Sequence, residues 1–202
     1  MPAKMTRATA LQHAAQAARG SLSSLNDLLR SLVDDKVADH PIAGPGITDG
    51  SGTVYRSSVH RRGDIIVTQI LLDLTGLKSA TSDLDIIGEA AAGDDAHLGQ
   101  ITIAINGTIL GGKMICLEAP LSLTDIDLYS ATVSSGQHED GIAALDERAL
   151  VTKGGAWAID SVEALTLLPR ANDYLYLVNG AGDTADDFTA GKFLIELYGY
   201  DA

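Results

Sequence analysis

Short stretches in which apolar and polar residues partly alternate follow one another through the carboxy-terminal three quarters of the chain, and turn-forming residues separate them. They are rich in β-branched and aromatic residues, which is typical of strands with one buried face. The stretches predicted as strands are 52–60, 65–74, 99–105, 112–118, 125–131, 161–168, 173–178 and 191–200. About eight strands in about 150 residues are typical of a two-sheet protein, so we expect a mainly β, jelly-roll-like sandwich over residues 52–202.

Local signals refine this expectation at a few places. Asn106-Gly107 follows one predicted strand directly and is a strong hairpin signal. Residues 141–151 are expected to add one short helix between strands, and residues 89–99 and 134–141 are expected to be surface loops.

The amino-terminal segment has a different period. Residues 8–36 are rich in Ala and Leu and contain no proline, which favours a helix. Apolar residues recur at alternating separations of four and three, which is the spacing of a heptad seam. The seam consists of Leu11, Ala15, Ala18, Leu22, Leu25, Leu29 and Leu32. We therefore expect an amphipathic helix within residues 1–38.

Two interpretations of that helix remain open. It can join copies of the chain or anchor the chain to another protein, as a heptad seam suggests. It can also pack on its own domain, because periods of 3.5 and 3.6 residues diverge little over about three heptads. Residues 39–51 contain Pro41, Pro45 and several glycines that break regular structure, so a linker is predicted there.

The charge of the chain limits its partners. The formal net charge is −13, and residues 1–36 hold five basic against three acidic residues, so the acidic excess lies in the body. An acidic body repels phosphates, and we expect no nucleic acid partner. No apolar run approaches the ~20 residues that span a bilayer, and the start of the chain lacks the apolar core of a signal peptide, so no membrane partner is expected.

Candidate chemical groups are sparse. The single cysteine, Cys116, lies between apolar residues and is interpreted as a buried thiol. Asp125 and Asp127 share one face of a predicted strand, which would suit calcium or acid–base chemistry, but no third member accompanies them. His138-Glu139-Asp140 is interpreted as a loop. The sequence shows no nucleotide-binding or nucleophile motif, so we expect no catalytic residues, no metal and no cofactor.

One basic cluster interrupts the acidic body. It consists of Arg56, His60, Arg61 and Arg62, and its two interpretations are a solvated strand end and a contact with a neighbouring subunit. Arg62-Gly63-Asp64 matches an adhesion tripeptide, yet a turn before a strand explains every residue in it. The only tryptophan, Trp157, is expected to be a packing anchor, with a sugar-stacking platform as the alternative.

The body resembles a group of virion structural proteins of tailed bacteriophages. The resemblance runs from about residue 52 to residue 202 and rests on segments in the same order: "GDIIVTQILLDLTGLKS", "DIIGE", "LGQITIAINGTILGGKMICLEAP", "DIDLYSA", "LPRANDYLYLV" and "TAGKFLIELYGYDA". It implies a β-rich domain of the capsid-decoration or head-fibre type, displayed on the phage head and often oligomeric. The expected partners are the major capsid protein or other virion subunits, and a homotrimer is favoured.

The sequence thus predicts a phage capsid-associated structural protein, made in the host cytoplasm and carried on the capsid surface. The main alternative is a tail adhesin or fibre-tip module that binds host surface glycans. A small hydrolase using Asp125 and Asp127, and a bacterial self-assembling surface protein, are further alternatives.

Overall fold

The computed structural model describes residues 40–90, 93–181 and 186–200. Residues 1–39 form a separate unit, and residues 40–202 form the body. The predicted helix within residues 1–38 and its seam lie outside the described residues, so they stay predictions.

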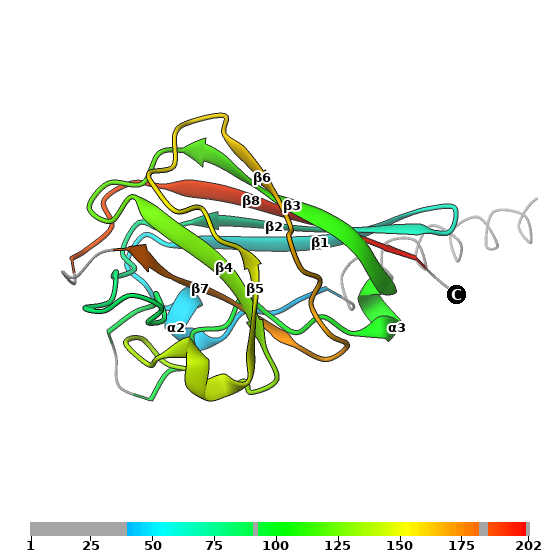
Figure 1. The fold of residues 1–202 in the computed structure, drawn as a ribbon, viewed down its shortest axis with the longest axis horizontal. Helices are drawn as coiled ribbons and strands as arrows, with labels where there is room; N and C mark the ends of the chain where they lie inside the picture. Colours follow the sequence, from blue (N-terminus) through cyan, green and yellow to red (C-terminus); the bar gives the residue numbers. More distant parts are fainter. Residues whose placement is uncertain (1–39, 91–92, 182–185, 201–202) are drawn as a thin grey trace, which may run out of the picture. The chain divides into compact units, whose positions relative to one another are not determined.

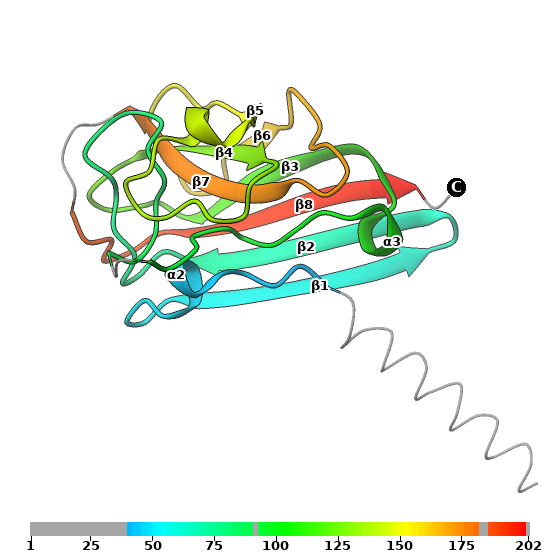
Figure 2. The ribbon, with the colours of Figure 1, turned by 90° about the horizontal axis from the view of Figure 1, so that it is seen from below.

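The body is mainly β and consists of two antiparallel sheets, which lie as two layers in Figures 1 and 2. The first sheet has the strand order β1-β2-β8-β3-β6 and the second has the order β5-β4-β7. The strands are β1 (Val54–Arg62), β2 (Ile65–Asp73), β3 (Thr108–Glu118), β4 (Asp125–Ala131), β5 (Glu147–Val151), β6 (Val162–Ala164), β7 (Tyr174–Ala181) and β8 (Lys192–Tyr200). Three single turns complete the described elements: α2 (Pro45–Thr48), α3 (Ile103–Asn106) and the 3₁₀ turn η1 (Ile142–Leu145). The predicted two-sheet β architecture is confirmed.

Period-2 alternation in β2 and β8 builds one wall of the core. Ile66, Thr68, Ile70 and Leu72 of β2 are buried, while the alternate residues Val67, Gln69 and Leu71 are only half-buried. In β8, Phe193 and Ile195 are buried in the same way and belong to the same core cluster. Because β8 pairs with both β2 and β3, it forms the centre of the larger sheet.

Of the predicted strand 99–105, only the first residues pair, through a β-bridge between Gln100 and Tyr174 of β7, and the predicted hairpin at Asn106-Gly107 is wrong. Ile103–Asn106 form one helical turn, in which the Ile105 amide donates a capping hydrogen bond to the Thr102 hydroxyl. The buried Asn106 side chain accepts a hydrogen bond from the Thr102 amide and donates one to the Thr68 hydroxyl of β2. Asn106 is therefore a tertiary anchor, and Gly107, with φ +68°, leads out of the turn into β3.

Two other predictions differ in extent. Of the predicted strand 161–168, Val162–Ala164 form β6 on β3, and the Leu165 amide still donates to the Gly112 carbonyl of β3. The next amide, that of Thr166, donates to the Leu150 carbonyl of β5, so the chain crosses to the other sheet there. In residues 141–151, the helical part is the short turn η1, and β5 follows it.

Residues 40–51 are packed into the body and are not a linker. Ile47 is fully buried, and the Gly44 and Gly46 amides donate to the carbonyls of His97 and Asp95. A Cβ at Gly44 would come within 2.1 Å of the Asp95 carbonyl oxygen, so the glycine permits this close approach. The glycines that suggested a flexible linker instead allow this segment to pack closely against the backbone of residues 95–97.

Candidate interaction surface

The face of the five-stranded sheet that points away from the core is the candidate functional surface. Residues paired across neighbouring strands share a face, so the strand registers define rows of side chains across the sheet. The charged row is Asp73–Lys192–Glu118, the apolar row is Leu71–Leu194–Ile115–Val162, and the next polar row is Gln69–Glu196–Lys113. Two more rows, Val67–Tyr198–Gly111 and Ile65–Tyr200–Thr108, complete this surface, which we call the outer sheet face.

The first charged row is an ion ladder centred on Lys192. Its ammonium lies 3.3 Å from Asp73 Oδ2 and also pairs with Glu118. The Thr75 amide and hydroxyl both donate to Asp73 Oδ1 and hold that carboxylate in place. The hydrogen bonds that Lys192 donates to Glu118 and Asp73 raise the pKa of Lys192 above its ordinary value.

The second polar row is a network centred on Glu196. One carboxylate oxygen accepts from Gln69 Nε2 at 2.7 Å, and the other accepts from the Tyr198 hydroxyl at 2.9 Å and pairs with Lys113 at 3.0 Å. Burial alone would raise the pKa of Glu196, but the three hydrogen bonds outweigh it and lower the pKa below its ordinary value. Both ladders are therefore fixed, charged arrays.

The apolar row lies between these two ladders. Leu71, Leu194 and Ile115 are half-buried by their neighbours, and Val162 is 52 % exposed. None of the residues of these five rows is buried, so no part of the described body forms a second layer over them. An antiparallel sheet that faces only water normally carries polar residues on that face. An apolar row framed by fixed charges is instead the usual composition of a protein–protein contact.

The predicted basic cluster is divided between the two faces of β1. Arg56 and His60 pair with Leu71 and Val67, so they belong to the outer sheet face. Arg61 pairs with the inward-facing Ile66 and lies on the opposite side. Arg62 is the last residue of β1, and its side chain is outside the described part of the structure.

Arg62-Gly63-Asp64 forms the hairpin between β1 and β2, as the turn interpretation predicts. Arg62 and Ile65 are the last pair of the ladder, so the hairpin loop consists of the two residues Gly63 and Asp64. Both loop residues are exposed. Gly63 has φ +64°, a conformation that glycine adopts without strain, and the first position of a type II′ turn requires it.

The acidic candidates do not assemble into a chemical site in the residues that the structure describes. Asp125 and Asp127 are both buried on β4, and burial raises the pKa of Asp127 although the Lys153 amide donates to it at 2.7 Å. Asp125 Oδ1 has no hydrogen-bond partner among the described residues. No group of three or more His, Cys, Asp or Glu that could hold a metal lies in the described ranges. Glu139 adopts φ +66°, as in a turn.

Trp157 and Cys116 are core residues. The indole is 3 % exposed and packs edge-on against Phe193, with ring centroids 5.2 Å apart. A buried ring cannot stack on a sugar, so the platform alternative for Trp157 is wrong. The Cys116 thiol is fully buried and its pKa is raised by that burial, as the sequence predicts.

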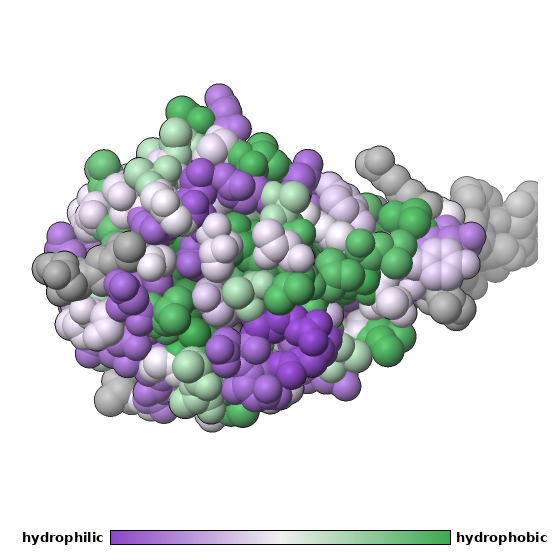
Figure 3. Space-filling model, in the orientation of Figure 1, coloured by the Kyte–Doolittle hydropathy of each residue, from purple (hydrophilic) through white to green (hydrophobic). Residues whose placement is uncertain are grey.

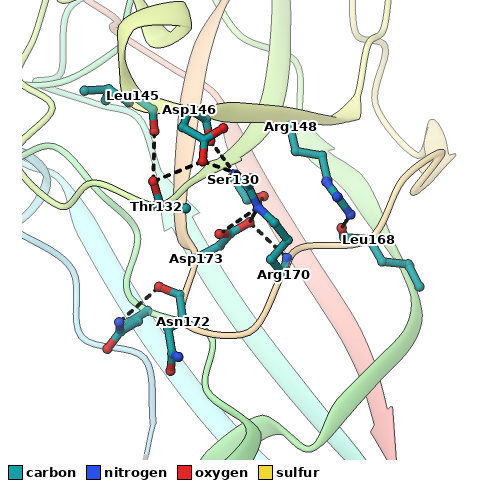
Figure 4. Close-up of polar contacts among 10 residues, drawn as sticks. Ser130, Thr132, Leu145, Asp146, Arg148, Leu168, Arg170, Asn172 and Asp173 are labelled. Atoms are coloured by element: carbon teal, nitrogen blue, oxygen red, sulfur yellow. Dashed lines mark hydrogen bonds and ion pairs between the residues drawn. The ribbon is translucent and has the colours of Figure 1, made fainter.

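A polar cluster that sequence reasoning missed fixes the loop before β7 (Figure 4). The Asp173 carboxylate is fully buried and accepts hydrogen bonds from the Ser130 hydroxyl and from the Arg170 amide and side chain. Arg170 also pairs with Asp146 at 3.0 Å, and Arg148 donates to the Leu168 carbonyl. The cluster ties β4, β7 and the start of β5 together and is structural.

Another apolar surface lies near α3. An apolar pocket of about 200 Å³ opens between α3, the start of β3 and residues 168–171. Ile103 on the pocket wall is exposed, and Figure 3 shows hydrophobic surface toward this end of the body. Arg170 on the pocket wall is already held by Asp146 and Asp173.

The Glu196 network predicts a specific pH dependence of stability. Because its folded pKa is lowered, Glu196 stabilises the fold above its unfolded pKa of about 4.3, and this contribution is lost as pH falls through the folded pKa. Glu196→Gln should lower the free energy of unfolding by about 1 kcal/mol at pH 7, and the difference from wild type should shrink below pH ~4. Urea unfolding followed by circular dichroism at several pH values measures this.

The matched control is Glu147→Gln, which alters an exposed carboxylate on β5. It should change stability little at any pH. A Glu196→Gln effect of the same size at pH 7 and pH 3 would contradict an ionised ladder.

The comparisons with known proteins identify no relative of this chain. No family model matches, no curated protein matches, and no solved structure matches. Within the residues that the structure describes, no helix is long and apolar enough to cross a membrane. The surface geometry above therefore carries the functional conclusion.

Proposed function

We propose that this chain is a structural protein of a tailed-phage particle, which attaches to the capsid shell as a decoration or head-fibre subunit. The observation that carries the proposal is the outer sheet face, where an apolar row lies between two fixed ion ladders with no covering layer from the described body. Such a face is suited to lasting contact with another protein subunit. The order of segments over residues 52–202, which resembles virion structural proteins, supports the same assignment.

The charge of the chain fits this role. A formal net charge of −13 keeps particles and free subunits apart in solution, so contacts form only where surfaces match. The jelly-roll-like form of the sandwich and the amphipathic amino-terminal helix belong to the proposal. In it, the seam that includes Leu22, Leu25 and Leu29 joins copies, with a trimer favoured, or anchors the chain to the shell.

The test is the protein composition of purified phage particles from the source of the sequence. Quantitative mass spectrometry should find the chain in particles at tens of copies or more, and antibodies against it should label heads. A chain that is present in the lysate but absent from purified particles would overturn the proposal. Labelling of tail tips at a few copies per particle, together with glycan binding, would favour the tail adhesin instead.

A further inference from the structure

The charges on the outer sheet face are arranged so that the face is complementary to the same face of a second copy. We propose that two copies of this chain pair through this face, about a two-fold axis that runs along the apolar row Leu71–Leu194–Ile115–Val162. This inference rests on the proposed structural function and names the partner of the same surface. It is carried by the order of charges in the two ladders on either side of the row.

A two-fold axis along the apolar row exchanges the ladders between copies. Each strand then faces the same strand of the second copy, and the row on one side of the axis faces the row on the other side. Lys192 of one copy lies opposite Glu196 of the second copy, and Glu118 lies opposite Lys113 of the second copy. Each of these ladder contacts joins opposite charges and occurs twice. Arg56 of β1, which pairs with Leu71, continues the row and faces Arg56 of the second copy, a like-charge contact at the end of the row.

The same axis brings the apolar side chains together. Leu194 faces Leu194 of the second copy, and Ile115 faces Ile115 of the second copy, at the centre of the contact. Half-exposed apolar groups thereby lose their contact with water. The ladders then form the polar rim, which is the arrangement of a specific interface.

The alternative two-fold axis, along strand β8, is disfavoured by charge. It would place Lys192 opposite Lys192 of the second copy and Glu196 opposite Glu196 of the second copy. It would also place Asp73 opposite Glu118 of the second copy, a third contact between like charges. Like charges juxtaposed across an interface are strongly unfavourable, so the ladder order selects the axis along the row.

The face is large enough for such a pair. Four long strands spaced about 4.8 Å apart, with a rise of about 3.4 Å per residue over about nine residues, present roughly 600 Å². Two copies would bury roughly 1,200 Å² in total, which lies at the lower end of specific interfaces. Two sheets with strands aligned in this way pack as the sheets of a sandwich do.

The test uses two charge reversals in the full chain, Lys192→Glu and Glu196→Lys. Each variant alone places like charges opposite one another at two contacts, so self-association should weaken about a thousandfold. At a concentration where wild type is fully paired, each variant should have half the wild-type mass by sedimentation equilibrium. An equimolar mixture of the two should regain the wild-type mass, because every exchanged contact then joins opposite charges.

The mixture separates a contact between chains from a defect within one chain. Both residues also belong to intrachain ladders, so circular dichroism must show that each variant is folded. Mixing changes neither chain internally, so recovery of mass can come only from pairing between them. Native mass spectrometry of the mixture should show mixed assemblies containing both variants.

Two results would overturn the proposal. One is an unchanged mass for either single variant, and the other is a mixture that stays at half the wild-type mass. If pairing fails while the chain is found in phage particles, this inference falls and the proposed function stands. If pairing succeeds while the chain is absent from particles, the proposed function falls and the pairing stands.

Discussion

Replacing Trp157 by alanine should lower the free energy of unfolding by about 3–5 kcal/mol, the range for large aromatic residues removed from a core. The indole is 3 % exposed, packs at 77° to the Phe193 ring of β8, and donates from Nε1 to the Ile126 carbonyl of β4 at 2.7 Å. It therefore joins the two sheets by packing and by one buried hydrogen bond. Alanine leaves a cavity between the sheets and a buried carbonyl without its donor.

Urea unfolding followed by far-ultraviolet circular dichroism measures this loss, since the variant has no tryptophan fluorescence. Trp157→Phe should cost less, because it keeps a ring against Phe193 and loses only the donor and part of the volume. Ile159→Ala is the matched control two residues away, where the side chain is 62 % exposed and the expected change is within about 0.5 kcal/mol. Equal costs for Trp157→Ala and Ile159→Ala would contradict a buried indole.

Replacing Arg170 by alanine should cost about 3 kcal/mol, because it leaves the carboxylate of Asp173 buried without its charged partner. Asp173 has no exposed surface, and Arg170 is its cationic neighbour in Figure 4. The Ser130 hydroxyl and the Arg170 backbone amide would remain as donors, so the carboxylate keeps part of its solvation. The variant loses stability because it lacks the ion pair between Arg170 and Asp173 and the second ion pair between Arg170 and Asp146.

Thermal and urea unfolding of Arg170→Ala, Arg170→Lys and Arg148→Ala distinguish these contributions. Lysine keeps the charge but not the fork that reaches both Asp173 and Asp146, so it should recover about half of the loss. Arg148→Ala removes one side-chain hydrogen bond to the Leu168 carbonyl and should cost about 1 kcal/mol. An Arg170→Ala cost no larger than that of Arg148→Ala would show that the ion pair to Asp173 is not needed for stability.

Strands with clear alternation could be predicted from the sequence. β2, β4 and β8 lie within the predicted ranges, and β7 begins within its predicted range but continues to Ala181, three residues beyond it. Their apolar residues recur at every second position or are buried on both faces. The Gly63 corner was also predictable, because a tight hairpin needs glycine's conformational freedom. These features depend on the local sequence, so they can be predicted from a single sequence.

Features fixed by distant partners could not be predicted. The sequence "ITIAINGT" (101–108) alternates like a strand, yet its middle, Ile103–Asn106, is a helical turn that the contact of Asn106 with Thr68 of β2 holds in place. The Pro- and Gly-rich residues 40–51 suggest a linker, and only the neighbouring carbonyls of Asp95 and His97 show why the glycines are there. The ion pair between Arg170 and the buried Asp173 likewise depends on the conformation of the loop, which the spacing of the residues in the sequence does not reveal.

Part of the outer sheet face could be predicted from the sequence. In "IIVTQILLDL" and "GKFLIELYGY", apolar residues occupy both phases of the alternation, so both faces of these strands carry apolar side chains. Which of them share a row depends on strand order and register, and β2, β8 and β3 are not consecutive in sequence. The cluster Arg56, His60, Arg61 and Arg62 was found as a charge pattern, but the pleat sends Arg56 and Arg61 to opposite faces.

The central claim is that the outer sheet face is a contact surface, and the solution mass of Leu194→Lys tests it most directly. Leu194 lies at the middle of the apolar row, and Leu121→Lys is the matched control, on an exposed loop leucine that belongs to none of the strand rows of that face. Sedimentation equilibrium of the full chain should give wild type and Leu121→Lys the same mass and Leu194→Lys half of it. A Leu194→Lys mass equal to that of wild type over the whole concentration range would contradict the account.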